Sequence, residues 1–419
     1  MLGGVQGNLE SSKRDYMLMI ASGTATMFSG GLIFPIFAPF VRGEFAAPLL
    51  LVGLAVSGYF LFRTFTELPI GMISDRMGPR TPLMLGRLLA LIGASVCYMT
   101  NDIWQLFFAR AIWGAGDASF FCIGMSYIAS LYPANRRGRA LGFFQAVENI
   151  GSFLGQSVGG FIAASFGIRS NFLAAIVLGS LSLGLVIMIK GKRVEQGKSN
   201  EGNQLHSTKE HFLGLINRTV ITVCSINFLG TALNNGLTST VLPIYVTEIM
   251  KMTLPQYGIL MAVSTVGSVC GNLFGGLASD RIGRKRILML GLAVGTVSTF
   301  SMTLSSSFQH FLPVLFFQGL FWGTLYGTTP VYIADSVPAN LRGMGIGLFR
   351  TFMDAGGLVG PIVMSSIVQF VDGTQGYIFS FYSGAVMLIL GLSLASMLKR
   401  MTTTQNADGK VEIRHIDRA

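Results

Sequence analysis

Eight ionisable side chains lie inside runs of apolar residues, where a charge is energetically costly and therefore points to function. Four of the side chains are basic and four are acidic, so the set can be neutral as a whole. Buried carboxylates can carry protons, and guanidinium groups can pair with them or with an anion. The eight residues are Arg63, Glu67, Arg87, Arg110, Asp117, Glu148, Arg350 and Asp354.

Two pairs in this set are spaced for contact along one helix. Arg63 and Glu67, like Arg350 and Asp354, are four residues apart, so each pair shares a helix face and is expected to pair locally. Arg87 lies close to one end of its apolar run, and we expect its long side chain to extend to the membrane surface.

Arg110, Asp117 and Glu148 have no evident partner on their own predicted helices, which makes them the strongest candidates for a proton or substrate pathway. Arg110 and Asp117 are seven residues apart, about two turns, on one helix face. The four histidines lie outside the interiors of the apolar runs, so we expect any proton carrier to be a carboxylate. For the neighbouring Asn234 and Asn235 we expect one contact with substrate and one hydrogen bond between helices.

The elements that position these residues are predicted to be membrane-spanning helices. Of the 419 residues, 51% are hydrophobic and only 12% are charged, whereas soluble proteins carry about 25% charged residues. This composition excludes an ordinary soluble enzyme, a disordered chain and a disulfide scaffold. Spans of roughly 17–25 apolar residues cross a bilayer as helices. We predict twelve, at 16–41, 49–73, 82–100, 104–130, 139–165, 170–190, 216–243, 255–279, 286–306, 310–334, 344–369 and 376–397.

The basic residues predict the orientation of these spans. If the N-terminus is cytoplasmic, 23 of the 30 Lys and Arg lie in inward segments, three in outward loops and four inside spans. This bias follows the positive-inside rule and predicts that both termini are cytoplasmic in a multi-pass protein of the plasma membrane. It also accounts for the net charge of +11 without nucleic acid as a partner.

The chain contains an internal repeat at one fixed offset of 205 residues. Residues 71–86 and 276–291 share nine identities in sixteen positions, and 133–160 and 338–365 share ten in 28. We therefore predict two pseudo-symmetric six-helix bundles, 1–190 and 213–419, the second with a cytoplasmic tail, joined by a cytoplasmic linker at 191–212. Repeats of this kind are typical of transporters that bind substrate between the repeats.

A loop motif recurs between the second and third spans and between the eighth and ninth. Its residues are Gly71, Asp75, Arg76, Gly78 and Arg80 in the first copy and Gly276, Asp280, Arg281, Gly283 and Arg284 in the second. The doubled motif resembles the signature loop of the major facilitator superfamily, and the resemblance covers essentially the whole chain. Physically, the glycines allow close packing and a tight turn, and the charged residues can form an ion-pair latch that opens and closes.

Two further blocks resemble the drug–proton antiporter group of that superfamily. Arg110 begins a motif whose arginine the resemblance implicates in proton transfer. A glycine-rich block in the fifth span is similar to the antiporter motif, with Gln156 in place of the family's proline, and the second half keeps that proline. The helix-packing residues of the two copies are Gly151, Gly155, Gln156 and Gly159, and Gly356, Gly360 and Pro361.

The resemblance implies a secondary transporter that works by alternating access, with proton-coupled export of small organic or amphipathic compounds as the favoured function. The alternative is a symporter or facilitator for a small metabolite such as an organic anion. Zinc-protease and nucleophile-elbow motifs are absent from the sequence, and Gly191 to Ser199 has the wrong spacing for a phosphate loop. We therefore expect no enzyme activity, cofactor or metal. The expected partners are a small-molecule substrate, protons and the lipid bilayer, and the expected state is a monomer.

Overall fold

The computed structural model describes residues 2–132, 134–190, 217–337, 342–371, 373–398, 400–405 and 411–416. In parts of the repeated loops and throughout the C-terminal tail, only the backbone is described. The predicted linker at 191–212 lies outside the described residues. The chain divides into two compact units, Met1–Gly197 with Thr253–Ile259 and Lys198–Met252 with Leu260–Ala419.

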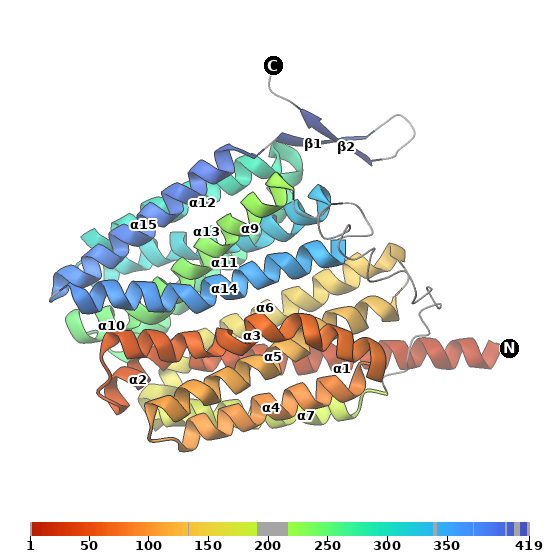
Figure 1. Cartoon of the computed structure of the whole chain (residues 1–419), viewed down its shortest axis with the longest axis horizontal. Coiled ribbons are helices and arrows are strands. Elements are labelled where there is room, and N and C mark those ends of the chain that lie inside the picture. The colour runs from red at the N-terminus through yellow and green to blue at the C-terminus, as the bar shows by residue number, and fades with distance from the viewer. Residues whose placement is uncertain are drawn as a thin grey trace. The chain divides into compact units, whose positions relative to one another are not determined.

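The first unit consists of long helices that lie side by side (Figure 1). Within it, α1 packs on α6 and α7, and α5 packs on α3 and α4. Every element that positions the buried charges of the first half therefore belongs to one bundle. The helices are α1 (Leu2–Ile33), α2 (Phe37–Glu44), α3 (Leu49–Met77), α4 (Arg80–Met99), α5 (Ile103–Leu131), α6 (Ala134–Phe166) and α7 (Arg169–Ile187).

The second unit repeats this arrangement, with α14 packed on α9 and α12 packed on α13 and α15. The predicted tail forms an antiparallel hairpin of β1 (Arg400–Gln405) and β2 (Val411–Ile416), in which Arg400 is opposite Ile416. The helices are α9 (Arg218–Leu233), η2 (Asn234–Val241), α10 (Leu242–Ile244), η3 (Tyr245–Ile249), α11 (Leu254–Ile282), α12 (Arg284–Ser301), η4 (Met302–Leu304), α13 (Phe308–Ser336), α14 (Arg342–Phe370) and α15 (Thr374–Ser396).

Helices dominate because a backbone in lipid must satisfy its own N–H and C=O groups. Ten helical segments among the described residues are long and apolar enough to cross a membrane. The helices α6 and α13, with 33 and 29 residues, lie outside that set. The predicted all-α membrane fold is confirmed, and the count of twelve spans holds approximately.

Two predicted spans differ from the structure in their course. The span predicted at 16–41 is not one helix, because α1 ends at Ile33 and α2 begins at Phe37. Pro35 lies in the turn, where its ring and missing N–H interrupt the helix. The span predicted to end at 243 continues to Ile249 and is π-helical over Asn234–Val241 and Tyr245–Ile249.

The internal repeat is visible in how the helices touch. An added Cβ at Gly114 of α5 would collide with the Tyr59 carbonyl oxygen of α3, and one at Gly319 of α13 would collide with the Ser264 carbonyl oxygen of α11. Both the glycines and the carbonyls are 205 residues apart. Helices in lipid pack closely through such small residues, so the two halves share the same close approach.

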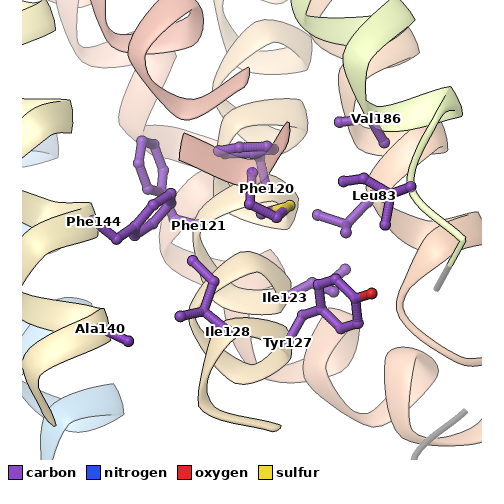
Figure 2. Packing of buried hydrophobic residues seen from close by; sticks show 11 residues of the cluster. Leu83, Phe120, Phe121, Ile123, Tyr127, Ile128, Ala140, Phe144 and Val186 are labelled. Carbon is purple, nitrogen blue, oxygen red and sulfur yellow. The ribbon is translucent and has the colours of Figure 1, made fainter. Parts of the chain in front are cut away.

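The apolar core of the first unit lies beside the helices that carry the charges. Figure 2 shows Phe121 and Phe144 close together, with Leu83 and Val186 on the other side of the cluster. These residues come from α4, α5, α6 and α7. Phe121 follows Asp117 by one helical turn, so packing of this cluster fixes the rotation of α5 at the point where the acidic side chain is positioned.

Candidate functional site

The centre of the candidate site is a buried ion pair between α4 and α5. Arg87 Nη2 lies 2.6 Å from Asp117 Oδ1, and each side chain is 3% exposed. The two helices approach closely because an added Cβ at Gly116 would lie 2.5 Å from both the Ala90 nitrogen and the Gly86 carbonyl oxygen. The expectation that Arg87 extends to the membrane surface is wrong: its guanidinium is held inside the bundle by an acid on the neighbouring helix.

Hydrogen bonds extend this ion pair in one direction to α3. Tyr59 donates from its hydroxyl to Asp117 Oδ2 at 2.7 Å, and Arg63 Nη1 donates to the Tyr59 hydroxyl at 3.3 Å. The carboxylate of Asp117 therefore accepts from two helices at once. A chain of such bonds in a low-dielectric interior holds its members more firmly than isolated bonds do.

In the other direction the hydrogen bonds lead to α1 and α7. Arg87 Nη1 donates to Thr26 Oγ1 at 2.8 Å, and the Thr26 hydroxyl lies 2.9 Å from Ser182 Oγ. Ser182 Oγ in turn lies 2.8 Å from Ser22 Oγ. The whole series, which we call the polar chain, consists of Arg63, Tyr59, Asp117, Arg87, Thr26, Ser182 and Ser22.

A small cavity lies against the polar chain, between α1, α4, α5 and α7. Its lining includes Thr26, Ser29, Arg87, Trp113 and Asp117, and its volume is about 10 Å³. That is about the space that one water molecule needs. Arg87 Nε is buried without a hydrogen-bond partner in the protein, so the cavity lies beside a donor that a single water can satisfy.

Glu67, a second acidic residue of this unit, makes weaker contacts than Asp117 does. Glu67 Oε1 lies 3.8 Å from Arg63 Nη2, four residues away, and both side chains are 8% exposed. This is the local pairing that the spacing predicts. Glu67 Oε1 nevertheless accepts no hydrogen bond and is buried, which leaves a carboxylate oxygen poorly compensated for its loss of water.

Arg110 does not pair with Asp117, although the two share a helix. Its guanidinium carbon instead lies 4.4 Å from the ring centre of Phe37, 4.7 Å from that of Tyr59 and 5.3 Å from that of Trp113. We call these three rings and the arginine the aromatic box. Phe37 is the first residue of α2, directly after the break between α1 and α2, so the break at Pro35 positions this ring.

Glu148 lies elsewhere in the unit, on α6 against α1. It is buried, with 6% exposure, and an added Cβ at Gly23 would lie 2.7 Å from Glu148 Oε1 and 3.0 Å from the Phe144 ring. The absence of a side chain at Gly23 therefore makes room for this carboxylate. The structure does not bring Glu148 together with Arg110 or Asp117 in the pattern that the sequence analysis favours.

The buried polar groups of the second unit include amides and a carboxylate. Ser298 and Thr299 donate to Gln318 Oε1 at 2.7 and 3.2 Å. Asn227 is fully buried, and neither its amide oxygen nor its amide nitrogen has a hydrogen-bond partner. Asp354 is buried at 1% exposure, whereas its neighbour on the helix, Arg350, is partly exposed.

The two asparagines singled out from the sequence are the first two residues of the π-helical segment η2. Asn235 Nδ2 donates to the Thr231 carbonyl at 3.1 Å, and the Asn235 carbonyl accepts from Thr240 Oγ1 at 2.7 Å. Both bonds stay on their own helix, so Asn235 does not make the predicted bond between helices. Asn234 accepts from Ser239 Oγ through its carbonyl. π-Helical turns are frequent at functional sites, which keeps this segment among the candidates.

The repeated loops show their turn geometry directly. Gly78 and Gly283 have φ of +81° and +98°, which L side chains rarely adopt, and each glycine lies directly after a helix. Arg80 Nη2 donates to the Ile187 carbonyl at 3.0 Å, while Arg284 pairs with Asp335 at the end of α13. Each arginine therefore makes its contact within its own unit. The side chains of the remaining charged motif residues lie outside those described: Asp75, Arg76, Asp280 and Arg281, together with the motif glycines Gly71 and Gly276.

The glycine-rich blocks provide close contacts within each unit. Gly151 and Gly155 of α6 face carbonyls of α1, and Gly356 and Gly360 of α14 face carbonyls of α9. Gly159 faces the Leu32 carbonyl in the same way. Gln156 donates to Ser152 Oγ of its own helix, and Pro361 lies inside α14 without ending it.

Reasoning from the sequence missed several polar residues that the structure places at the site. Tyr59, Thr26 and Ser182 join the polar chain, and Asn227 and Gln318 are the buried amides of the second unit. The sequence contains one indication of this polar chain: Arg87 lies in an apolar run and has no acidic residue nearby on its own helix. Its partner lies thirty positions along the chain on another helix, which spacing alone does not identify.

Comparison with known proteins gives a consistent result. The sequence profile of the Major Facilitator Superfamily matches residues 19–233 and 224–414. The riboflavin transporter RibZ of Clostridioides difficile (strain 630) is 24% identical over 445 residues, covering 92% of this chain and 97% of RibZ. Multidrug resistance protein 2 of Bacillus subtilis (strain 168) is 24% identical over 397 residues, covering 92% and 96%.

A solved structure shares the fold. The inward-facing, unoccupied form of a bacterial homolog to the human lysosomal transporter Spinster superposes with a TM-score of 0.76 at 14% identity. The match covers 92% of this chain and 96% of that chain. The relatives are named for different cargoes, so the shared fold does not by itself specify a substrate.

Proposed function

The chain belongs to the Major Facilitator Superfamily, and on that premise we propose that it is a proton-coupled exporter of small amphipathic organic compounds. As a multi-pass membrane transporter it moves a small molecule across the bilayer. The proposal adds the cell membrane as its location, both termini in the cytoplasm, a monomeric state, and protons as the coupling ion. Support for export comes from the relatives named as multidrug resistance proteins and from the antiporter-like glycine block.

The observation that carries proton coupling is the environment of Glu67. This carboxylate is 7% exposed, one of its oxygens accepts no hydrogen bond, and its arginine partner is 3.8 Å away. We propose that this carboxylate takes up and releases the coupled proton, since one of its oxygens is buried without a hydrogen bond. Arg63, which also donates to Tyr59, can then turn fully to the polar chain.

Asp117 and Glu148, the other candidate carboxylates of the unit, make different contacts. Asp117 accepts at both oxygens, from Arg87 and from Tyr59, so we assign it to holding the bundle and orienting Tyr59. Glu148 lies over Gly23 on the helix pair α1 and α6, and it is the second proton-carrying candidate. This order differs from the sequence-based hypothesis, which ranked Asp117 beside Glu148 and above Glu67.

The experiment is transport into proteoliposomes with permanently charged probes that share one ring system. Naphthalenesulfonate is the anion and naphthylmethyl-trimethylammonium the cation, so neither redistributes with pH as a weak acid or base. An antiporter accumulates probe when the lumen is acidic, and a symporter accumulates it when the outside is acidic. Protein-free vesicles give the baseline.

Glu67→Gln is the decisive variant. We expect it to lose accumulation driven by an acidic lumen while probe-for-probe exchange persists, because exchange needs no proton movement. Glu148→Gln tests the second candidate in the same assay. Full pH-driven accumulation in both variants would refute Glu67 and Glu148 as the proton carriers. Wild-type uptake that only equilibrates the probe, whatever the pH gradient, would contradict proton coupling and favour a facilitator.

A further inference from the structure

The buried charges of the first unit do not match one to one. Arg63 is opposite Glu67, and Arg87 is opposite Asp117. Among the residues that the structure describes, no acidic side chain forms an ion pair or hydrogen bond with Arg110. Glu148 is not the acidic partner of Arg110, because it lies over Gly23 of α1. From Gly23 to the end of α1 at Ile33 the helix rises about 15 Å, and Phe37, the aromatic partner of Arg110, lies beyond that end.

The close contacts of the Arg110 guanidinium are therefore with aromatic rings. Its Nε is buried and makes no hydrogen bond, and the residue as a whole is partly exposed. A guanidinium carries five N–H donors, and here no protein acceptor takes any of them. Contacts with Phe37, Tyr59 and Trp113 at 4.4–5.3 Å offset part of the cost of removing the cation from water. They supply no hydrogen-bond acceptor, so the terminal N–H groups remain available to a ligand.

Aromatic faces and a guanidinium fork together select a particular kind of molecule. The planar fork matches a carboxylate or sulfonate with two parallel hydrogen bonds. The surrounding rings favour an apolar or aromatic body next to that anionic group. A cationic compound would instead meet a like charge at a partly buried guanidinium, which is unfavourable.

We propose that Arg110 in the aromatic box anchors the transported molecule, and that the molecule is an organic monoanion carrying an aromatic or apolar body. The inference rests on the proposed transport function and specifies its substrate class. Tyr59 gives the anchor a connection to the polar chain, since its ring lies under Arg110 while its hydroxyl donates to Asp117. Trp113 similarly contacts Arg110 and lines the small cavity beside Arg87.

The test measures binding by isothermal titration calorimetry to the purified full chain in lipid nanodiscs. The probes are naphthalenesulfonate, the neutral naphthalenesulfonamide and naphthylmethyl-trimethylammonium, with inorganic phosphate as an anion without an apolar body. We expect the sulfonate to bind at least about tenfold more tightly than the other three. Only the sulfonate can both accept charge-assisted hydrogen bonds from the guanidinium and pack its ring system against the aromatic box. Equal or tighter binding of the amide or the cation, or no binding of the sulfonate, would overturn the proposal.

Variants separate the anchor from general charge effects. Arg110→Gln should weaken sulfonate binding at least about tenfold and leave sulfonamide binding unchanged, and Arg110→Lys should fall between Gln and wild type because it keeps the charge but loses the fork. The control is Arg169→Gln, which removes a partly exposed guanidinium that pairs with Glu44 and should leave sulfonate binding unchanged. Unchanged sulfonate binding in a folded Arg110→Gln protein, checked by its melting temperature, would refute the anchor.

The outcome is distinguishable from failure of the proposed function. Tight sulfonate binding without pH-driven uptake would retain the anchor and reject proton coupling. Uptake of the cation driven by an acidic lumen, with no sulfonate binding, would retain proton-coupled export and reject the anchor.

Discussion

The two halves of the chain share a packing pattern and differ in what that pattern encloses. Gly114 and Gly319 bring their helices against equivalent carbonyls, 205 residues apart. The same offset places Leu292 at the position of Arg87 and Trp322 at that of Asp117. The ion pair of the first half thus has only apolar residues at the equivalent positions of the second.

The difference extends along the rest of the site. Ser268 and Asn272 occupy the positions of Arg63 and Glu67, and Leu315 occupies that of Arg110. Close helix contacts are set by backbone geometry and are kept in both copies. The charges depend on single side chains and are free to diverge, so these charged positions of the first unit have neutral counterparts, and the core of the second unit contains amides such as Asn227 and Gln318.

The largest expected effect comes from breaking the buried ion pair. Asp117→Leu leaves the Arg87 guanidinium buried without its acid, which should lower the free energy of unfolding by roughly 3–5 kcal/mol. The double variant Arg87→Leu with Asp117→Leu makes this place as apolar as its counterpart in the second half and should recover most of that loss. Thermal unfolding in detergent micelles measures both. A single variant as stable as the wild type would show that the pair does not hold the bundle.

The next effect tests whether the shared packing matters equally in both halves. Gly114→Ala and Gly319→Ala each force a methyl group into a carbonyl of the neighbouring helix, which should cost about 1–3 kcal/mol in either unit. The controls are Gly142→Ala and Gly347→Ala, also 205 residues apart, where an added Cβ meets nothing within 4 Å. Controls as destabilised as the test variants would argue against the packing explanation.

A smaller effect is expected from Tyr59→Phe. This change removes the hydrogen bond to Asp117 Oδ2 but keeps the ring under Arg110, so stability should fall by about 1.5 kcal/mol. Binding of naphthalenesulfonate should remain within a factor of about two. Calorimetry on the same preparation measures both quantities in sequence. A large loss of sulfonate binding would mean that the hydroxyl, and not only the ring, serves the anchor.

The smallest effect on stability is expected from the repeated loops. Asp75→Asn and Asp280→Asn each keep a hydrogen-bond acceptor while removing a charge. The free energy of unfolding should therefore change by less than about 0.5 kcal/mol. Transport in proteoliposomes should nevertheless fall, because a latch built from ion pairs depends on the charge. If both variants transport at the wild-type rate, the loops are turns without a gating role.

The sequence by itself determined the class of the protein, its helical architecture and its repeat. Apolar runs of membrane-spanning length leave a backbone little alternative to helices, and a fixed offset of 205 residues relates the two halves without any coordinates. The i,i+4 spacing was likewise enough to pair Arg63 with Glu67, because both residues lie on one helix whose geometry is known in advance.

Only the tertiary structure decided which charges meet across helices. Arg87 and Asp117 pair because glycines at Gly86 and Gly116 let α4 approach α5. Arg110 lies on the same helix as Asp117 but contacts three aromatic rings instead. One of these rings is positioned by the break at Pro35. In lipid a helix is apolar on nearly every side, so periodicity does not reveal which face meets which neighbour, and the partners of buried charges follow from packing alone.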